Sequence, residues 1–296
     1  MKASAPPSAG WLFAHSARDA LLVALAALQL AAAVAGVALW SALPWPALLG
    51  LGAALVVLYP VNVNCVSHNF IHNRFFTWRP LNVVFSVFNS LAFGLPQTIY
   101  HWHHLNHHRW NNDAKRPDGT TRDLSSIYRY SRTDGPEHVL AYSLLSFFRV
   151  SFPALIRKAR RHRMGPLLLA EALAVVTLLG ALALLDWRGF VCFYLPTWYL
   201  GWSLSSTENY YEHWGADPRD RYANSVSSYG RLYNLLTFNN GYHMEHHWRP
   251  QVHWTRVPEV TAEFGETFRA HGLRVLRGPH ITAFLEPPAP RAGAAP

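Results

Sequence analysis

Four histidine-rich motifs contain the residues of this chain whose types and spacing could do chemistry. Two are HxxHH motifs, at residues 104–108 and 243–247, one is HxxxH at residues 68–72, and one is NxxxH at residues 209–213. On a helix, residues three and four positions apart share a face, so each motif can aim two or three side chains at one point. Neutral imidazole is a good ligand for iron, zinc, copper and nickel. The motifs therefore predict a metal site.

The number of side chains in these motifs favours two metal ions over one. The motifs supply nine imidazoles and one amide, whereas a tetrahedral zinc ion takes four ligands. Two ions of higher coordination number fit this set better, so we predict a dinuclear site. We expect no catalytic side chain beyond the metal ligands.

The second motif has an alternative register, because His103 and His107 also have the spacing of helix neighbours. We expect His104, His107 and His108 to face the metal, with His103 supporting them. An acid close to the motifs could accept a hydrogen bond from an imidazole N–H and so orient the ring; otherwise it is a solvated surface acid. The candidate acids are Asp113, Glu208, Glu212 and Glu245.

The hydrophobic pattern predicts an all-α integral membrane protein. The chain has 296 residues, of which 50% are hydrophobic and only 15% charged, and residues 20–73 contain no Asp, Glu, Lys or Arg. A bilayer span needs about 20 apolar residues, so this stretch can cross twice, and two more apolar stretches follow a long loop. We predict four transmembrane helices in two hairpins, over residues 20–43, 47–67, 166–185 and 189–207.

The distribution of basic residues predicts the orientation. The net charge is +9, with 26 Lys and Arg against 17 Asp and Glu, and many of the cations lie between the second and third spans. Since cytoplasmic loops carry the excess of Lys and Arg, we expect both termini and this loop in the cytoplasm. A cytosolic helical cap, over residues 68–165 and 208–286, would then hold the metal site.

The domain organisation that follows is simple. We expect one membrane domain over residues 20–286, a cytosolic segment over residues 1–19 and a disordered tail over residues 287–296. Two more apolar stretches, at residues 81–99 and 139–156, are either interfacial helices or a third membrane hairpin.

The sequence disfavours several other classes of protein. HExxH is absent, since Glu245 is third in its motif, so a metalloprotease is disfavoured. Only two cysteines occur and they form no CxxC pair, which disfavours thiolate zinc and iron–sulfur sites. The arginine-rich run at residues 157–163 is expected to face lipid headgroups rather than nucleic acid. A metal transporter would place its histidines within the spans rather than at their ends, and a single-zinc hydrolase is a minor alternative.

At the four motifs the chain resembles the integral-membrane fatty acid desaturase and hydroxylase superfamily, whose members show HxxxH, HxxHH and HxxHH boxes in this order. The resemblance covers residues 47–254. The sequence GYHMEHH at residues 241–247 is similar to the last box of lipid and sphingolipid desaturases. The NxxxH motif at residues 209–213 is similar to an additional Asn and His of stearoyl-CoA desaturases and to an element of alkane hydroxylases.

The resemblance implies a non-haem di-iron centre that takes O2 as a co-substrate. Asn209 would reach a metal through water. Because the chain shows no electron-carrier domain, a separate donor such as a ferredoxin or a reductase is implied. The implied iron ligands are His68, His72, His104, His107, His108, His213, His243, His246 and His247.

We interpret the chain as an O2-dependent oxidoreductase that desaturates the alkyl chain of a fatty acid or lipid. A hydroxylase or ketolase of alkyl chains or carotenoids is the alternative, because the ligands do not decide between these reactions. The Arg- and Ala-rich composition indicates a bacterial inner membrane, with the metal site on the cytoplasmic side.

Overall fold

The computed structural model describes residues 10–288, which form a mainly helical chain with one two-stranded sheet. Contacts between residues divide this part of the chain into two compact units. Unit 1 contains the residues up to 105 and residues 147–205, and unit 2 contains residues 106–146 and those from 206 onward. Each unit is therefore assembled from two separate stretches of sequence.

Two helices begin in unit 1 and end in unit 2. Helix α5 (Gln97–Trp110) passes the boundary after Leu105, and α10 (Leu195–Tyr211) passes it after Ser205. The second histidine motif lies on α5, and the NxxxH motif begins on α10. The single domain expected over residues 20–286 stays a prediction.

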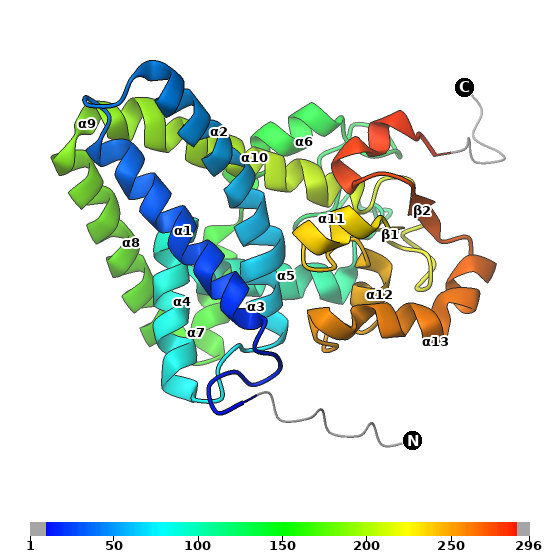
Figure 1. The fold of residues 1–296 in the computed structure, drawn as a ribbon. Coiled ribbons are helices and arrows are strands. Elements are labelled where there is room, and N and C mark those ends of the chain that lie inside the picture. Colours follow the sequence, from blue (N-terminus) through cyan, green and yellow to red (C-terminus); the bar gives the residue numbers. More distant parts are fainter. Residues whose placement is uncertain (1–9, 289–296) are drawn as a thin grey trace. The chain divides into compact units, whose positions relative to one another are not determined.

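Unit 1 is built around long apolar helices. Helix α1 (Asp19–Ala38) packs on α2 (Trp45–Val61) and on α4 (Arg79–Phe93), and α4 packs along α8 (Gly165–Leu185), as Figure 1 shows. The amino-terminal stretch joins the same unit, because the Ala14 N–H donates to the Phe75 carbonyl oxygen at 2.8 Å. Residues 1–9 and 289–296 lie outside the described residues, and so does most of the predicted tail.

Three helices in the described part of the chain are long and apolar enough to cross a membrane. Each exposes large apolar side chains, such as Leu28, Val57 and Leu173, over more than half of their surface. Such exposure suits a helix that lipid surrounds, and it identifies a membrane protein. The three helices cover residues Asp19–Ala38, Trp45–His72 and Gly165–Leu185, and they match three of the four predicted spans.

The second of these helices continues beyond α2 as far as the first histidine motif. A π-helical stretch (Asn62–Ser67) leads from α2 into α3 (His68–His72), so the helix is unbroken over 28 residues. The π-helical turn follows Pro60, which lies inside the helix and has no N–H for the regular hydrogen-bond pattern. The motif therefore sits at the end of a candidate span, as expected.

The fourth predicted span is helical but is not one of these three. Residues 187–211 form α9 (Trp187–Gly189), a second π-helical stretch (Phe190–Tyr194) and α10. The sequence here carries several Ser, Thr and Tyr residues, which lower its hydropathy. Another candidate is the pair α4 and α5, which meets the criterion only if the two helices, bent by 91°, form one broken span. The arrangement of four spans in two hairpins therefore stays a prediction.

The bend between α4 and α5 depends on a glycine. Gly94 ends α4 with φ of 74°, in the left-handed region that favours glycine. A Cβ atom at this position would lie 2.5 Å from Trp198 Nε1. The Trp198 indole N–H also donates to the Phe93 carbonyl oxygen at 3.3 Å, so the ring is held where a larger residue would need space.

Residues 139–156 form several short helical elements. The structure divides them among α6 (Val139–Leu145), a 3-10 turn (Phe147–Arg149) and the start of α7 (Phe152–Arg161). A bilayer span needs about 20 apolar residues, so no described helix of this stretch is long enough to cross. Of the two predicted alternatives, short interfacial helices fit these lengths.

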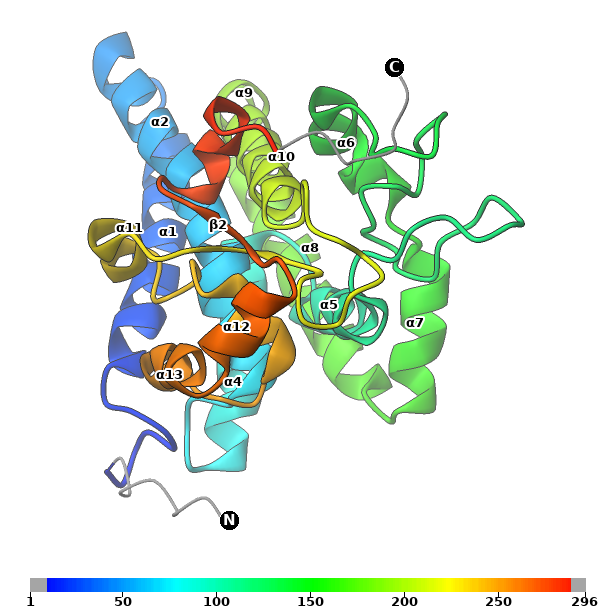
Figure 2. The same ribbon diagram turned by 90° about the vertical axis from the view of Figure 1, so that its right-hand side faces the viewer.

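Unit 2 contains the sheet, which the all-α prediction missed. Strands β1 (Val226–Ser228) and β2 (Arg274–Leu276) pair in parallel. Helix α12 (His243–Trp248) packs on β1, and α13 (Val257–Ala270) packs on α12. Figure 2 shows α13 next to α12, with β2 above α12. Strands of three residues carry too little alternation to be recognised from sequence.

The close contact at Gly94 predicts a selective loss of stability. The substitution Gly94→Ala is expected to lower the free energy of unfolding by about 2 kcal/mol, because a left-handed alanine costs about 1–2 kcal/mol and the new Cβ meets Trp198. Gly180→Ala on α8 is the matched control, since a Cβ there meets nothing within 4 Å. Thermal unfolding in detergent checks the pair, and equal melting temperatures would contradict the prediction.

Candidate metal centre

Buried polar groups of unit 1 hold the amino end of α5. The Gln97 N–H donates to Ser90 Oγ at 2.8 Å. The Thr98 N–H donates to Glu171 Oε2, also at 2.8 Å. Glu171 lies fully buried on α8 and accepts a further bond of 2.6 Å from Ser86 Oγ. Since the first N–H groups of a helix lack partners within it, these contacts determine where α5 begins and how its histidines are turned.

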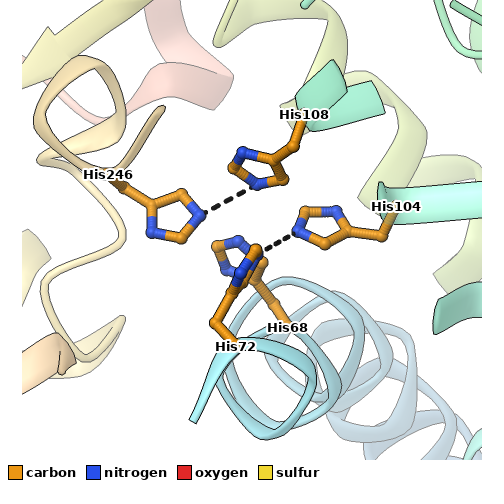
Figure 3. A group of neighbouring side chains, drawn as sticks. All are labelled: His68, His72, His104, His108 and His246. Atoms are coloured by element: carbon orange, nitrogen blue, oxygen red, sulfur yellow. Dashed lines mark hydrogen bonds between the residues drawn. The ribbon is translucent and has the colours of Figure 1, made fainter. Parts of the chain in front are cut away.

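Unit 1 contains a group of three histidines whose ring nitrogens approach one another. His68 and His72 come from α3 and His104 comes from α5, and each offers a ligand atom within 4.8 Å of the other two. The His72 and His104 Nε2 atoms are 2.7 Å apart, along one dashed line of Figure 3. His68 Nδ1 lies 3.0 Å from the Asn64 carbonyl oxygen, which can only accept a hydrogen bond. The His68 Nε2 atom therefore keeps its lone pair for a ligand.

Unit 2 contains a second group, of four histidines. His107 comes from α5, His213 follows α10, and His243 and His247 come from α12. Their ligand atoms all lie within 4.8 Å of one another. Consecutive Nε2 atoms are 3.0 Å apart for His107 and His213, 3.2 Å for His213 and His243, and 3.1 Å for His243 and His247.

The positions of the protons in this group fit a bound cation. His107 Nδ1 lies 2.7 Å from Asp123 Oδ2, and His213 Nδ1 lies 3.2 Å from the Asn224 carbonyl oxygen, so both Nδ1 atoms are donors. Burial, reinforced by the neighbouring His107, lowers the pKa of His213 to about 3, so this ring is neutral. The Nε2 lone pairs of His107 and His213 then face each other at 3.0 Å. A metal ion placed between such atoms turns this repulsion into coordination.

Two further histidines of the motifs form a pair in unit 2. His108 Nε2 and His246 Nε2 are 3.0 Å apart, along the other dashed line of Figure 3. The His108 ring also stacks on His247, with centroids 4.4 Å apart. All nine predicted histidine ligands thus lie in one of these three arrangements, each within its own unit.

Asn209, the predicted ligand through water, has its amide held by a hydrogen bond. Its Nδ2 donates to Tyr142 Oη at 2.7 Å, and Tyr142 Oη donates to the Ser125 carbonyl oxygen at 2.7 Å. Because the amide nitrogen is used in this way, the Asn209 Oδ1 atom is the one left to accept a hydrogen bond or bind an ion.

The predicted supporting acids have different roles in the structure. Glu212 Oε1 lies 3.6 Å from His243 Nδ1 and accepts a 2.7 Å bond from Asn240, so it is placed beside an imidazole. Glu245 instead accepts bonds from three hydroxyl groups. Asp113 accepts bonds from backbone N–H groups in the loop after α5. His103 is half-buried and belongs to no histidine group of residues 10–288.

Glu208 lies in a chain of hydrogen bonds with a buried histidine. Tyr233 Oη is 2.8 Å from Glu208 Oε1 and 3.0 Å from His280 Nδ1. His280 Nε2 in turn lies 2.9 Å from the Val226 carbonyl oxygen, and the ring is fully buried. His280 is thus a packed histidine with both ring nitrogens engaged.

The residues that orient the motifs were not predicted from the sequence. Asp123 accepts a hydrogen bond from His107, Tyr142 holds the Asn209 amide, and Glu171 caps α5. No fixed spacing links any of them to a motif. The one available signal was Glu171, because an acid within an apolar span is costly and usually has a role.

The candidate spans and the histidines of the four motifs, which gather in groups that could hold metal ions, define the class: a helical membrane protein with a histidine-rich candidate metal site. A family model described as fatty acid desaturase matches residues 43–278. The chain therefore belongs to the fatty acid desaturase family.

Curated relatives agree with this family. The chain is 26% identical over 253 residues to a sphingolipid delta(4)-desaturase DES1-like protein of Oryza sativa, an alignment that covers 81% of this chain and 74% of the relative. It is 28% identical to the sphingolipid delta(4)-desaturase of Candida albicans, over 67% of this chain and 57% of the relative. It is 30% identical to sphingolipid delta(4)-desaturase DES1 of Drosophila melanogaster, over 69% of this chain and 63% of the relative. The chain thus spans less than two thirds of the length of the last two.

The four-histidine group predicts a loss of metal on substitution. His213→Ala is expected to lower metal affinity at least about tenfold, because it removes a ligand from the middle of the group. His271→Ala is the control, since His271 pairs with Asp220 on the surface of the same unit. Elemental mass spectrometry of purified, metal-loaded protein checks both variants. Equal metal content in the two would remove His213 from the predicted ligands.

Proposed function

We propose that this protein is a membrane lipid desaturase that uses two iron ions and O2. The observation that carries the proposal is the set of imidazole Nε2 atoms in the four-histidine group, which approach to 3.0–3.2 Å while the Nδ1 atoms of His107 and His213 are used as donors. The histidine ligands are neutral, which suits a metal that must keep a high positive charge until an oxygen ligand binds. Membership of the fatty acid desaturase family supports the same reaction.

We propose that the nine histidines hold two iron ions, one of them at the four-histidine group. Support comes from their number, because nine imidazoles exceed the ligands that one ion takes. Asn209 would complete the site through a water molecule, with its Oδ1 as the acceptor.

Bound iron would supply the activation of O2 needed to remove hydrogen from an unactivated C–H bond. In a desaturation, the substrate loses two hydrogen atoms, and O2 takes these together with two electrons and two protons to give two water molecules. The residues of this chain do the rest. They hold His107 and His213 by Nδ1 contacts, and they keep His107, His213 and His243 buried from water.

We propose a lipid with a long alkyl chain, of the sphingolipid class, as the substrate. The relatives reported above carry sphingolipid delta(4)-desaturase in their names. The first histidine motif ends a candidate span, so a chain lying in the bilayer is within reach of the unit that carries it. The reaction makes the protein an oxidoreductase.

The electrons must come from a separate carrier, such as a ferredoxin or a reductase. The net charge of +9 would attract an acidic carrier to the exposed basic residues. We further propose four spans, with both termini and the metal site in the cytoplasm. The reported relatives are eukaryotic, so they do not support the predicted bacterial inner membrane, and that location stays a prediction.

The first experiment is iron stoichiometry followed by product analysis. The purified protein is expected to bind close to two irons per chain. With a reducing partner, O2 and a dihydrosphingolipid, the product is expected to be lighter than the substrate by two hydrogens. A gain of one oxygen would instead identify the hydroxylase, and a single zinc without O2 uptake would contradict the proposal.

A matched pair of variants tests the assignment of the ligands. His246→Ala is expected to lower turnover at least about a hundredfold, because it removes one of two closely paired imidazoles. His138→Ala is the control, since His138 caps α6 through the Leu140 N–H and belongs to no histidine group of the described residues. Turnover by mass spectrometry of the lipid product checks both, and retained activity in His246→Ala would remove this residue from the site.

A further inference from the structure

The rings of the four-histidine group differ in the hydrogen-bond acceptors near their Nδ1 atoms. His107 Nδ1 lies 2.7 Å from a carboxylate oxygen, that of Asp123. His213 Nδ1 has a backbone carbonyl oxygen at 3.2 Å. His243 Nδ1 is 3.6 Å from Glu212, which is beyond hydrogen-bond distance. Among these three rings, His107 is therefore the one with a direct charged hydrogen bond.

Asp123 is built to be an anion at this position. Its side chain is fully buried. Its Oδ2 atom accepts bonds of 2.7 Å from His107 Nδ1 and from the Asn112 N–H, and its Oδ1 atom accepts bonds of 2.8 Å from the Ser125 N–H and hydroxyl. Four donors thus stabilise one buried carboxylate.

The loop after α5 folds back so that Asp123 contacts His107 on this helix. Asn111 and Asn112 end the helix with φ of 48° and 55°, in the left-handed region that asparagine tolerates. Asn112 Oδ1 then accepts the Ile127 N–H at 2.9 Å, which closes the loop. Asp113 accepts the Asp123 N–H at 2.9 Å. These contacts bring a residue 16 positions along the chain back onto His107.

We propose that Asp123 is a positioning residue that fixes His107 with its proton on Nδ1 and its Nε2 lone pair directed at the metal of the four-histidine group. The inference rests on the proposed function only in requiring that this group binds a metal. A carboxylate that accepts the second N–H of a ligating imidazole orients the ring and raises its basicity. Asp123 therefore strengthens binding at this group and not at the second proposed ion.

The same unit offers a matched control for this contact. Asp220 Oδ2 lies 2.7 Å from His271 Nδ1, and Asp220 Oδ1 accepts the Tyr222 N–H at 2.8 Å. Like Asp123, Asp220 accepts hydrogen bonds from one imidazole and from a backbone N–H. The Asp220–His271 pair lies at the surface and includes no motif residue. Asp220→Asn removes a carboxylate–imidazole contact without touching the site.

The test is a titration of the metal-free full-length protein with Co2+, followed by absorption spectroscopy, which needs neither iron nor turnover. Wild type is expected to bind two ions. Asp123→Asn keeps the side chain's shape and removes its charge, and it is expected to weaken one of the two sites by about 10- to 100-fold and to shift that site's visible bands. Asp220→Asn is expected to match wild type at both sites.

Three outcomes would overturn the inference. Asp123→Asn could bind both ions with wild-type affinity and spectra. It could weaken both sites equally together with a lowered melting temperature, which would show a merely structural role. Wild type could fail to bind any Co2+, which would remove the proposed metal site as well. The first two outcomes leave the proposed function intact, so the two failures are distinguishable.

A milder variant keeps the test decisive if Asp123→Asn does not fold. Ser125→Ala removes the hydroxyl that donates to Asp123 at 2.8 Å and lies 3.2 Å from His107 Nδ1, and it leaves the carboxylate in place. The same single site is expected to weaken by a smaller factor, about two- to fivefold, with the same direction of band shift. No change at either site would overturn the inference.

Discussion

The mutual approach of neutral imidazoles is the constraint on which the structure of the site depends. The ligand atoms of His107, His213, His243 and His247 lie within 4.8 Å of one another. Burial lowers the pKa of His213, His243 and His247, so protonating these three rings is costly. Lone pairs at such distances repel. Two things can offset this repulsion. Hydrogen bonds at the Nδ1 atoms of His107 and His213 fix these rings, and a cation between the Nε2 atoms would attract all four nitrogens. A bound metal would supply the attraction, and the protein supplies the geometry.

The contacts that hold the rings come from far along the chain. Glu171 on α8 caps the helix that carries His107, Asp123 returns to that histidine through a loop, and Tyr142 on α6 holds the Asn209 amide. Each is a buried polar group with its hydrogen bonds satisfied, which a low-dielectric environment makes strong when complete and expensive when incomplete. The rigidity of the site is therefore distributed over the surrounding helices and loops rather than confined to the motifs.

The two units differ in the surfaces and the elements that they contain. Unit 1 exposes leucines and valines on long helices, which suits lipid, whereas unit 2 combines short helices with a two-stranded sheet. Helices α5 and α10 belong to both, so a histidine motif can start from an apolar helix and end among polar residues. The bend at Gly94 turns the chain between α4 and α5, so α5 runs in a new direction before its histidine motif begins.

The sequence by itself determined the apolar helices, the motifs and the family, because each depends on residue types at short, regular spacings. It predicted three helices that the structure contains as candidate spans, and the nine histidines that the structure gathers in groups. It gave no indication of the short parallel sheet or of Asp123. It named Asp113 and Glu245 as candidate supports for imidazoles, and in the structure these acids accept bonds from backbone N–H and hydroxyl groups. Only tertiary structure decided these points, because a hydrogen bond between residues distant in sequence depends on the path of the chain, and that path is set by packing rather than by any local pattern.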